Sequence, residues 1–358
     1  MADAANAHRP VLPPKGADDL TSEWLTAAMA RPGTITALTK TPVGTGQIAD
    51  SIRCALTWDP PEAGPTSVVV KVTSSSEVSR AAAARTRNYE VEVGFYRDMA
   101  ATIPVYAPAC YWAGHDPATN GYAVVLDDMA PAVQGDQMAG CSVDDAALAL
   151  DEAAALHAAR WEDLSLADLP WLSAGLAGSP AMAPLIERLG PTYVDRYGDQ
   201  LSPEVVELVG RYHLAIGASA PHEGPKTVVH NDFRVDNLLF GGDRVCVLDW
   251  QTVSFGPGIL DVSYFLGGSL LPDARRAAER DLVRRYHEHM RAGGVDISWD
   301  DCWRQYRRHA FAGLTMAIIA SAMVVRTDRG DDMFIAMGER AALHALEMET
   351  EALLVSRP

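Results

Sequence analysis

The sequence is poor in cysteine and has no paired cysteine motif. Its 358 residues include five cysteines, which are widely scattered and never spaced as C-x-x-C. Disulfide frameworks need an even set of cysteines, so reduced thiols are the simpler interpretation of an odd number. We therefore expect the fold to depend on a buried apolar core and not on disulfide bonds.

Targeting and membrane-spanning segments are also lacking. Residues 1–16 contain prolines and small polar residues, but no basic region followed by an apolar core such as a secretory signal has. The longest apolar run, residues 311–325, is interrupted by Thr315 and Ser321 and is too short to cross a bilayer. We expect this run to form a buried helix, and we expect a cytoplasmic protein that contacts no membrane.

Positive charge is scarce. Thirty Lys and Arg residues stand against 47 Asp and Glu residues, which gives a formal net charge of −17. This charge repels phosphate backbones, so nucleic acid is not an expected partner, and it weakly favours cationic small molecules. The chain is 48% hydrophobic and longer than a usual domain, which predicts a folded protein of two domains or two lobes.

The order of the predicted elements divides the chain into three parts. Residues 1–18 are predicted to be a flexible tail. Residues 19–129 contain a helix at 21–30, two strands around a glycine turn within 43–58, a buried strand at 67–73, a helix at 79–100 and a strand at 122–126. Residues 130–358 are mostly helical, apart from a β-like segment at 227–251. Strands followed by helices indicate an α+β protein with a small N-terminal lobe and a larger helical C-terminal lobe.

The most informative segment is 229–251. Two apolar runs are separated by a Gly-Gly-Asp turn, which predicts a β-hairpin, and polar residues stand at the ends of the runs: His230, Asp232, Asn237 and Asp249. Phosphoryl transfer needs a carboxylate that accepts the proton of the attacking hydroxyl, together with oxygen ligands for Mg²⁺. The pattern H-x-D-x-x-x-x-N followed by a strand ending in Asp offers both. The alternative is that these residues only cap the hairpin.

This pattern matches a kinase catalytic loop, which implies Asp232 as the catalytic base and Asn237 and Asp249 as metal ligands. Protein kinases have D-F-G where this chain has Asp-Trp-Gln, and no A-P-E segment follows. The sequence HNDFRVDN with LDW resembles the aminoglycoside phosphotransferase and choline kinase-like superfamily of small-molecule kinases. In that family an aspartate at the position of Asp261 usually holds the catalytic loop.

The resemblance implies a bilobal, protein-kinase-like fold with a small antiparallel-sheet lobe that binds nucleotide and a larger helical lobe with the catalytic loop and acceptor pocket. ATP and Mg²⁺ are the implied cofactors, and a small-molecule hydroxyl compound is the implied acceptor.

A kinase fold also requires a glycine-rich hairpin and a strand lysine held by a helix glutamate. Residues Gly44, Thr45, Gly46 and Gln47 are the candidates for the phosphate-binding hairpin, although Ala49 replaces the third glycine and an ordinary tight turn explains them almost equally well. Lys71 lies inside a β-branched run and needs an anion beside it unless it lies on an edge strand. Glu92 shares the apolar face of the following helix and is the expected partner, whereas Glu90 points away.

A hinge that binds adenine through backbone groups is expected after the strand at 122–126. It would use the carbonyl of Asp127 and the N–H of Met129. A simple chain crossing between two lobes explains the same residues equally well.

Our interpretation is an ATP-dependent kinase of a small-molecule hydroxyl. A metal-dependent phosphohydrolase and a non-catalytic pseudokinase are the alternatives. Acidity and resemblance favour an amino sugar or an aminoglycoside-like antibiotic as acceptor, with antibiotic resistance as a hypothesis. Segments 134–141 and 262–332 are expected to form the acceptor pocket, and His157 is expected to be a structural histidine within an apolar helix.

Overall fold

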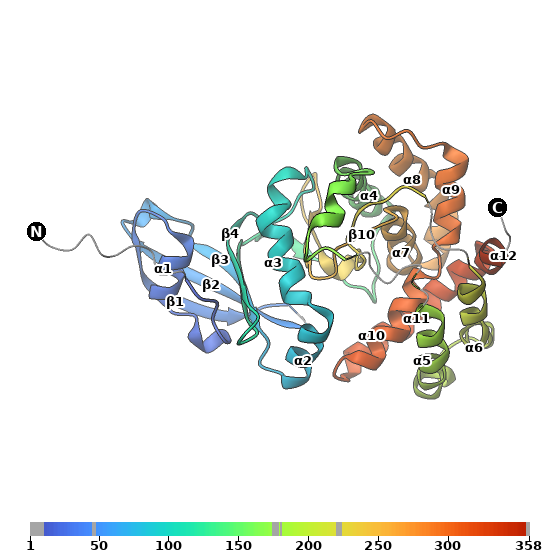
Figure 1. Cartoon of the computed structure of the whole chain (residues 1–358), viewed down its shortest axis with the longest axis horizontal. Coiled ribbons are helices and arrows are strands. Elements are labelled where there is room, and N and C mark those ends of the chain that lie inside the picture. Colours follow the sequence, from blue (N-terminus) through green and yellow to red (C-terminus); the bar gives the residue numbers. More distant parts are fainter. Residues whose placement is uncertain (1–10, 45–47, 174–178, 180, 220–223, 356–358) are drawn as a thin grey trace, which may run out of the picture. The chain divides into compact units, whose positions relative to one another are not determined.

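The computed structural model describes residues 11–44, 48–173, 179, 181–219 and 224–355, and Figure 1 shows the arrangement of its helices and strands. The chain forms two compact units. The first unit comprises residues 1–98 and 108–129, and the second comprises residues 99–107 and 130–358. Segment 99–107, which we expected in the N-terminal lobe, belongs to the second unit because the N–H of Val247 donates to the Tyr106 carbonyl and the N–H of Tyr106 donates to Glu152.

The first unit is built on a five-stranded antiparallel sheet with the order β1-β2-β3-β5-β4. The strands are β1 (Thr34–Pro42), β2 (Ala49–Asp59), β3 (Ser67–Thr73), β4 (Cys110–Asp116) and β5 (Gly121–Asp127). Strand β3 is central, as its β-branched run predicts, and its Val68, Val70 and Val72 are completely buried. The first strand begins at Thr34 and not near residue 43. The sequence pattern did not indicate this strand, because most of its side chains are exposed and show no apolar alternation.

Helices flank this sheet (Figure 1). Helix α1 (Ser22–Met29) begins after Thr21, whose side chain accepts the Trp24 N–H. The single helix expected over 79–100 is divided into α2 (Glu77–Thr86) and α3 (Asn88–Asp98), because Arg87 between them adopts a left-handed backbone conformation with φ of 60°.

Residues 11–18, which were expected in a flexible tail, contact other parts of this unit. The indole N–H of Trp24 donates to the Leu12 carbonyl at 2.8 Å, and the ammonium of Lys40 donates to the Ala17 carbonyl at 2.7 Å. The remaining residues of the expected tail, 1–10, lie outside the described residues.

The second unit is mostly helical, as expected. Its helices are α4 (Val143–Ala159), α5 (Met182–Tyr197), α6 (Pro203–Ala218), α7 (Ile259–Ser269), α8 (Pro272–Ala292), α9 (Trp299–Arg308), α10 (Ala312–Met323), α11 (Asp328–Glu347) and α12 (Thr350–Val355). Helix α7 is buried along its whole length, which is typical of a helix that is apolar on all sides. Helix α10 forms the middle of the apolar run at 311–325, and its Leu314 and Ile318 are completely buried.

Two small sheets precede α7 in the chain. Strands β7 (Thr227–Val229) and β10 (Ser254–Gly256) pair with each other, and β8 (Leu238–Phe240) pairs with both β6 (Val133–Gln134) and β9 (Cys246–Val247). The β8–β9 pair is the predicted hairpin. The pairing of β6 was not predicted, because a strand of two residues has no hydrophobic pattern.

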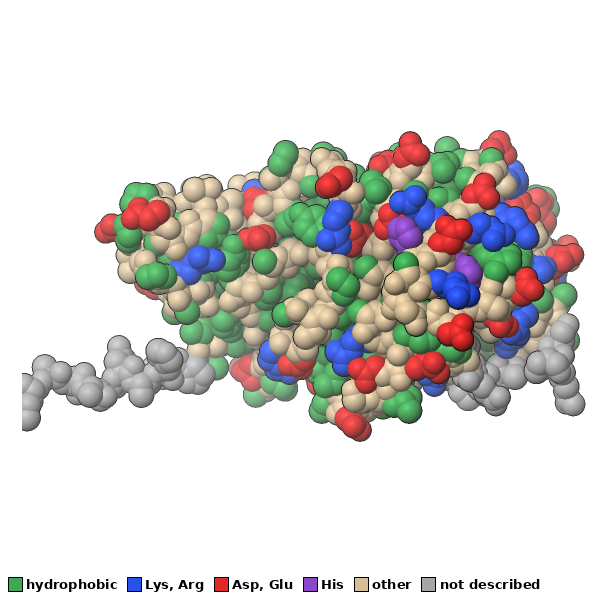
Figure 2. Space-filling model, turned by 90° about the horizontal axis from the view of Figure 1, so that it is seen from above, with side chains coloured by type: hydrophobic (Ala, Val, Ile, Leu, Met, Phe, Trp, Pro, Cys, Tyr) green, Lys and Arg blue, Asp and Glu red, His purple; other side chains and the backbone are tan. Residues whose placement is uncertain are grey.

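The surface charges of the second unit are interspersed. On the face shown in Figure 2, blue Lys and Arg side chains lie among red Asp and Glu side chains. The ion pairs include Arg285 with Asp151 at 2.7 Å and Arg211 with Glu351 at 3.0 Å. Within the described part of the chain, no helix combines the length and the apolar character needed to cross a bilayer.

Candidate active site

The segment that follows β7 is held by the carboxylate of Asp261 on α7. One oxygen of this buried side chain accepts the N–H of His230 at 2.7 Å, and the other accepts the N–H of Asn231 at 2.8 Å. Bonds from N–H groups to an ionised carboxylate are stronger than bonds between neutral groups. Asp261 therefore fixes the backbone of the H-x-D segment immediately before Asp232.

The side chains of His230 and Asn231 tie the same segment to the β8–β9 hairpin and to β10. His230 Nε2 lies 2.9 Å from the Leu248 carbonyl, and its Nδ1 accepts the N–H of Asp232, so both bonds are satisfied when the proton is on Nε2. Asn231 adopts a left-handed conformation with φ of 64°, which asparagine tolerates, and its amide donates to the Thr252 carbonyl at 2.7 Å.

His157 of α4 supports Asp261, which agrees with the structural role expected for it. Its Nε2 lies 3.2 Å from Asp261 Oδ2, and its Nδ1 lies 3.0 Å from the hydroxyl of Tyr286 on α8. A Cβ atom at Gly258 would lie 2.8 Å from His157 Cγ, so the absence of a side chain there allows α7 to begin against the histidine ring.

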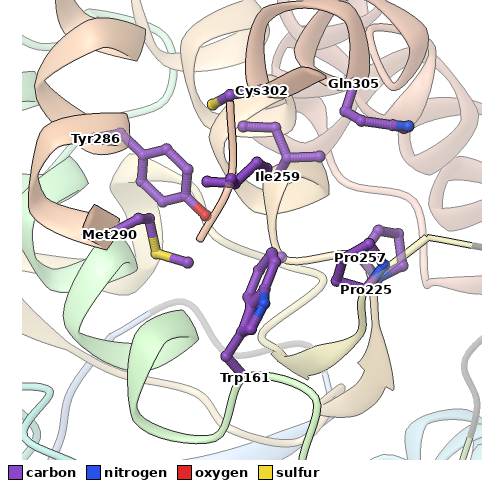
Figure 3. Close-up of a pocket in the computed structure, with 10 residues that line it drawn as sticks. Trp161, Pro225, Pro257, Ile259, Tyr286, Met290, Cys302 and Gln305 are labelled. Atoms are coloured by element: carbon purple, nitrogen blue, oxygen red, sulfur yellow. The ribbon is translucent and has the colours of Figure 1, made fainter. Parts of the chain in front are cut away.

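A small cavity lies beside this contact. It has a volume of about 30 Å³, and Figure 3 shows Trp161, Tyr286 and Met290 among its apolar lining. This volume is far below the roughly 300–1,000 Å³ of a typical ligand pocket. The cavity thus belongs to the packing around the start of α7.

Within the described residues, the carboxylate of Asp232 receives three hydrogen bonds. The hydroxyl of Tyr264 on α7 donates to Oδ1 at 2.9 Å, and Arg234 Nε donates to the same oxygen at 3.2 Å. The amide of Asn237 donates to Oδ2 at 2.8 Å. Each carboxylate oxygen offers about two acceptor positions, so Oδ1 is fully used and Oδ2 retains one.

The donors to Asp232 stay protonated. Burial, and next the negative charge of Asp232, raise the pKa of the Tyr264 phenol well above its ordinary value. Burial acts to lower the pKa of Arg234, but the nearby Asp232, Tyr264 and Asp236 outweigh it, so that the pKa lies above its usual value. Sequence reasoning missed Tyr264, because 32 residues separate it from Asp232. It passed over Arg234 although this residue lies inside the motif.

Asn237 and Asp249 lie at the same end of the β8–β9 hairpin. The N–H of Leu248 donates to the Asn237 carbonyl at 2.8 Å, so Asp249 follows directly after the residue opposite Asn237. The Asn237 side chain uses its NH₂ group on Asp232, which leaves its amide oxygen available. Asp249 has a left-handed backbone with φ of 66°, and the amide of Gln251 donates to its carboxylate at 3.2 Å.

An amide oxygen and a carboxylate are the oxygen ligands that Mg²⁺ prefers, and Mg²⁺ usually completes its shell with water and phosphate oxygens. The donor set of Asn237 and Asp249 therefore fits this ion. Among the residues that the structure describes, no three His, Cys, Asp or Glu side chains form a metal-binding group.

In the first unit, Lys71 and Glu92 form an ion pair. Lys71 Nζ lies 2.6 Å from Glu92 Oε1, and Glu92 is completely buried. The hydroxyl of Tyr122 on β5 also donates to Glu92. Lys71 lies on the central strand of the sheet and not on an edge, whereas Glu90 points outward and pairs with Arg87.

The remaining predicted nucleotide residues are placed as follows. Gly44 has φ of 74°, which favours glycine, while Thr45, Gly46 and Gln47 lie outside the described residues. The carboxylate of Asp127 at the end of β5 accepts the hydroxyl of Tyr111. The N–H of Met129 donates to no acceptor within the described residues.

An antiparallel-sheet unit with a lysine–glutamate pair, together with a helical unit that carries the H-x-D-x-x-x-x-N loop, defines the protein-kinase-like class of folds. Residues 60–303 match the Phosphotransferase enzyme family (APH). Since this is more than half of the chain, the protein belongs to that family of phosphotransferases.

Solved structures share the fold at low sequence identity. Choline kinase from Cryptosporidium parvum Iowa II gives a TM-score of 0.55 at 11% identity, covering 88% of this chain and 89% of its own. APH(2")-IIa in its gentamicin complex gives a TM-score of 0.51 at 18% identity, covering 90% of this chain and 94% of its own. Identities this low show the fold alone.

A shorter stretch is more similar in sequence. The chain is 41% identical over 88 residues to the N-acetylmuramate/N-acetylglucosamine kinase of Neisseria meningitidis serogroup B (strain ATCC BAA-335 / MC58). The match spans 23% of this chain and 25% of that relative, so only about a quarter of the curated relative is covered.

Proposed function

We propose that the protein transfers the γ-phosphoryl group of ATP to a hydroxyl group of an N-acetylated amino sugar. The observation that carries the proposal is Asp232, which is held rigidly in a phosphotransferase-family chain and has one acceptor position open on Oδ2. In the reaction, the acceptor oxygen forms a bond to the γ-phosphorus of ATP. The bond between the γ-phosphorus and the β,γ-bridging oxygen breaks, and ADP leaves with that oxygen. The hydroxyl proton passes to Asp232, and the products are a sugar phosphate, ADP and a proton.

Asp232 orients the nucleophile. The acceptor hydroxyl donates to Oδ2, because Tyr264 and Arg234 already occupy both positions on Oδ1. A carboxylate fixed by three donors cannot rotate away from the hydroxyl, so the hydroxyl is held in one orientation for attack.

Separate residues are assigned to the phosphates, the adenine ring and the metal ion of the nucleotide. Lys71, held by Glu92, binds phosphate oxygens, and Gly44, the described residue of the glycine-rich hairpin, offers its backbone N–H to them. The adenine ring bonds to the Asp127 carbonyl and the Met129 N–H. Asn237 and Asp249 would hold Mg²⁺, which neutralises the charge that develops on the phosphates during transfer.

The acceptor class rests on the curated relative, whose name gives two N-acetylated amino sugars as substrates. Aminoglycoside antibiotics are the second candidate class. The net charge of −17 favours cationic acceptors of this kind, and a resistance function would follow if they were substrates.

The test is release of ADP by the purified protein with MgATP and a panel of acceptors. The panel contains N-acetylglucosamine, N-acetylmuramate, glucosamine, gentamicin and choline, and ³¹P NMR identifies the phosphorylated position. We expect turnover of the N-acetylated sugars. Turnover of gentamicin alone would replace the acceptor class, and no ADP release with any acceptor would contradict the proposed reaction.

Two variants assign the roles. Asp232→Asn should lower kcat by about 10³-fold or more while calorimetry shows unchanged binding of MgATP. Asp249→Asn should weaken MgATP binding as well, because it removes the charge of a metal ligand. Full phosphotransfer by Asp232→Asn would show that Asp232 is not the base.

A further inference from the structure

Arg234 lies between two carboxylates of the catalytic loop. Its Nε donates to Asp232 Oδ1 at 3.2 Å, and its Nη1 donates to Asp236 Oδ2 at 2.5 Å. Nη1 also lies 3.5 Å from the sulfur of Met333 on α11. The side chain of Arg234 is 18% exposed, so the guanidinium is largely but not completely enclosed.

The second carboxylate is itself anchored. Asp236 is 4% exposed, and its Oδ1 accepts the N–H of Gln137 at 2.8 Å. The amide of Gln137 donates to the Gly268 carbonyl at the end of α7, and Arg340 of α11 donates to the Gln137 carbonyl at 2.8 Å. Asp236 therefore holds the guanidinium of Arg234 in a fixed orientation.

One nitrogen of Arg234 is left over. Within the described residues, Nη2 donates to no acceptor, although Nε and Nη1 are both used. A buried guanidinium N–H without an acceptor is costly. Nη2 is not fully buried, so it is in contact with solvent. It is an oriented cationic donor beside the catalytic carboxylate.

The position of Nη2 relative to Asp232 favours the acceptor over the nucleotide as its partner. Arg234 and Tyr264 bond to Oδ1, whereas Asn237, the proposed metal ligand, bonds to Oδ2. Arg234 and the residue that would hold Mg²⁺ therefore contact different oxygens of Asp232. Arg234 instead contacts Met333, and its partner Asp236 accepts the N–H of Gln137, which lies in the segment expected to form the acceptor pocket.

The local charge indicates the chemistry of the partner. Two carboxylates, Asp232 and Asp236, face one guanidinium, so a further negative charge at Nη2 would be repelled. An ammonium group at Nη2 would place one N–H donor against another. A neutral carbonyl oxygen accepts from Nη2 without either penalty.

We propose that Arg234 Nη2 donates to the carbonyl oxygen of an acylamino group next to the reacting hydroxyl, and so selects N-acylated acceptors. This inference rests on the proposed function. The acceptor is then held at two points, its hydroxyl on Asp232 Oδ2 and its acyl oxygen on Arg234. A bond to a charged donor changes the affinity for the transition state by about tenfold to a hundredfold.

The experiment compares two acceptors that differ at one position. N-acetylglucosamine carries the acyl group next to the anomeric hydroxyl, and 2-deoxyglucose has only hydrogen there. Wild-type kcat/KM should be at least about tenfold higher for N-acetylglucosamine. The variant is Arg234→Lys, because a single ammonium retains the charge between Asp232 and Asp236 but lacks the forked donors.

Arg234→Lys should reduce the preference for N-acetylglucosamine by about tenfold, with a smaller loss for 2-deoxyglucose and an unchanged dissociation constant for MgATP. The matched control is Arg285→Lys, which alters an arginine paired with Asp151 on the surface of α8 and should leave the preference unchanged.

Three results overturn the inference. Equal losses for both sugars, together with slower acceptor-independent ATP hydrolysis, would place Arg234 on the phosphoryl group. Equal kcat/KM values of the wild-type protein for N-acetylglucosamine and 2-deoxyglucose would overturn the inference whatever the variant does. Turnover of neither sugar, with ADP release on another acceptor, would reject the proposed acceptor class and this inference together, whereas the first two results leave the proposed function standing.

Discussion

The carboxylate of Asp261 allows the contribution of loop anchoring to be measured. In Asp261→Asn, one of the two oxygens becomes an NH₂ group of nearly the same size. Asp261 accepts the N–H groups of His230 and Asn231 on different oxygens, so in either orientation of the new amide one loop N–H faces a donor. His157 can change its tautomer to suit the amide, but a backbone N–H cannot.

The expected cost follows from these contacts. A buried N–H without an acceptor costs about 1–3 kcal/mol, and the remaining bond weakens because its acceptor is no longer ionised. We expect a total of about 2–4 kcal/mol. If the loop keeps its position, this cost lowers the free energy of unfolding. If the loop shifts instead, Asp232 is displaced and kcat falls by roughly 30-fold to 1000-fold.

Two assays separate these outcomes. Urea denaturation gives the free energy of unfolding, and coupled ADP release gives kcat with an acceptor that supports turnover. Binding of MgATP, measured by calorimetry, should change less than about threefold. The control is Asp281→Asn on the exposed face of α8, which should change neither quantity. Retention of both wild-type stability and wild-type kcat in Asp261→Asn would refute the anchoring role.

Three further predictions address other contacts. Tyr264→Phe removes one donor to Asp232 and should lower kcat about tenfold with little change in the KM for ATP, whereas an equal change in both would indicate general loss of structure. Lys71→Met should raise the dissociation constant of ATP by tenfold or more by calorimetry, and unchanged binding would contradict a phosphate contact. Burial raises the pKa of the Cys302 thiol to about 12, so the unfolded chain loses this proton first as the pH rises above 9. Under reducing conditions, the free energy of unfolding should fall by about 1 kcal/mol by pH 10 for each thiol buried in this way. Cys302→Ala should show a smaller fall. The same pH dependence in the variant and the wild type would contradict the raised pKa of Cys302.

The sequence was sufficient for the fold class and for the elements with strong apolar patterns. Strand β3 and the β8–β9 hairpin were predicted because their apolar runs are continuous and bounded by turn residues. Strand β4 was missed, since all of its side chains are half-buried and give no alternation. The break at Arg87 was missed as well, because neither glycine nor proline marks it.

In the candidate site, too, some residues could be predicted from the sequence and others could not. Asp232, Asn237 and Asp249 could be proposed because their spacing matches a known motif, and their roles stay predictions. Contacts between distant segments could not be read from one sequence. The hydrogen bond of Tyr264 to Asp232 depends on the packing of α7, and the anchoring of Asp236 depends on the turn at Gln137.

The left-handed backbone at Asp249 limits which residues evolution can place there. A residue with a Cβ atom pays about 1–2 kcal/mol for this conformation, and Asn and Asp adopt it more readily than other residues except glycine. With the proposed metal-ligand role of Asp249, selection for folding and selection for metal affinity act on one position. Asparagine satisfies the first requirement without the full charge of the second, so a descendant that lost catalysis would be expected to drift first to asparagine or glycine at residue 249.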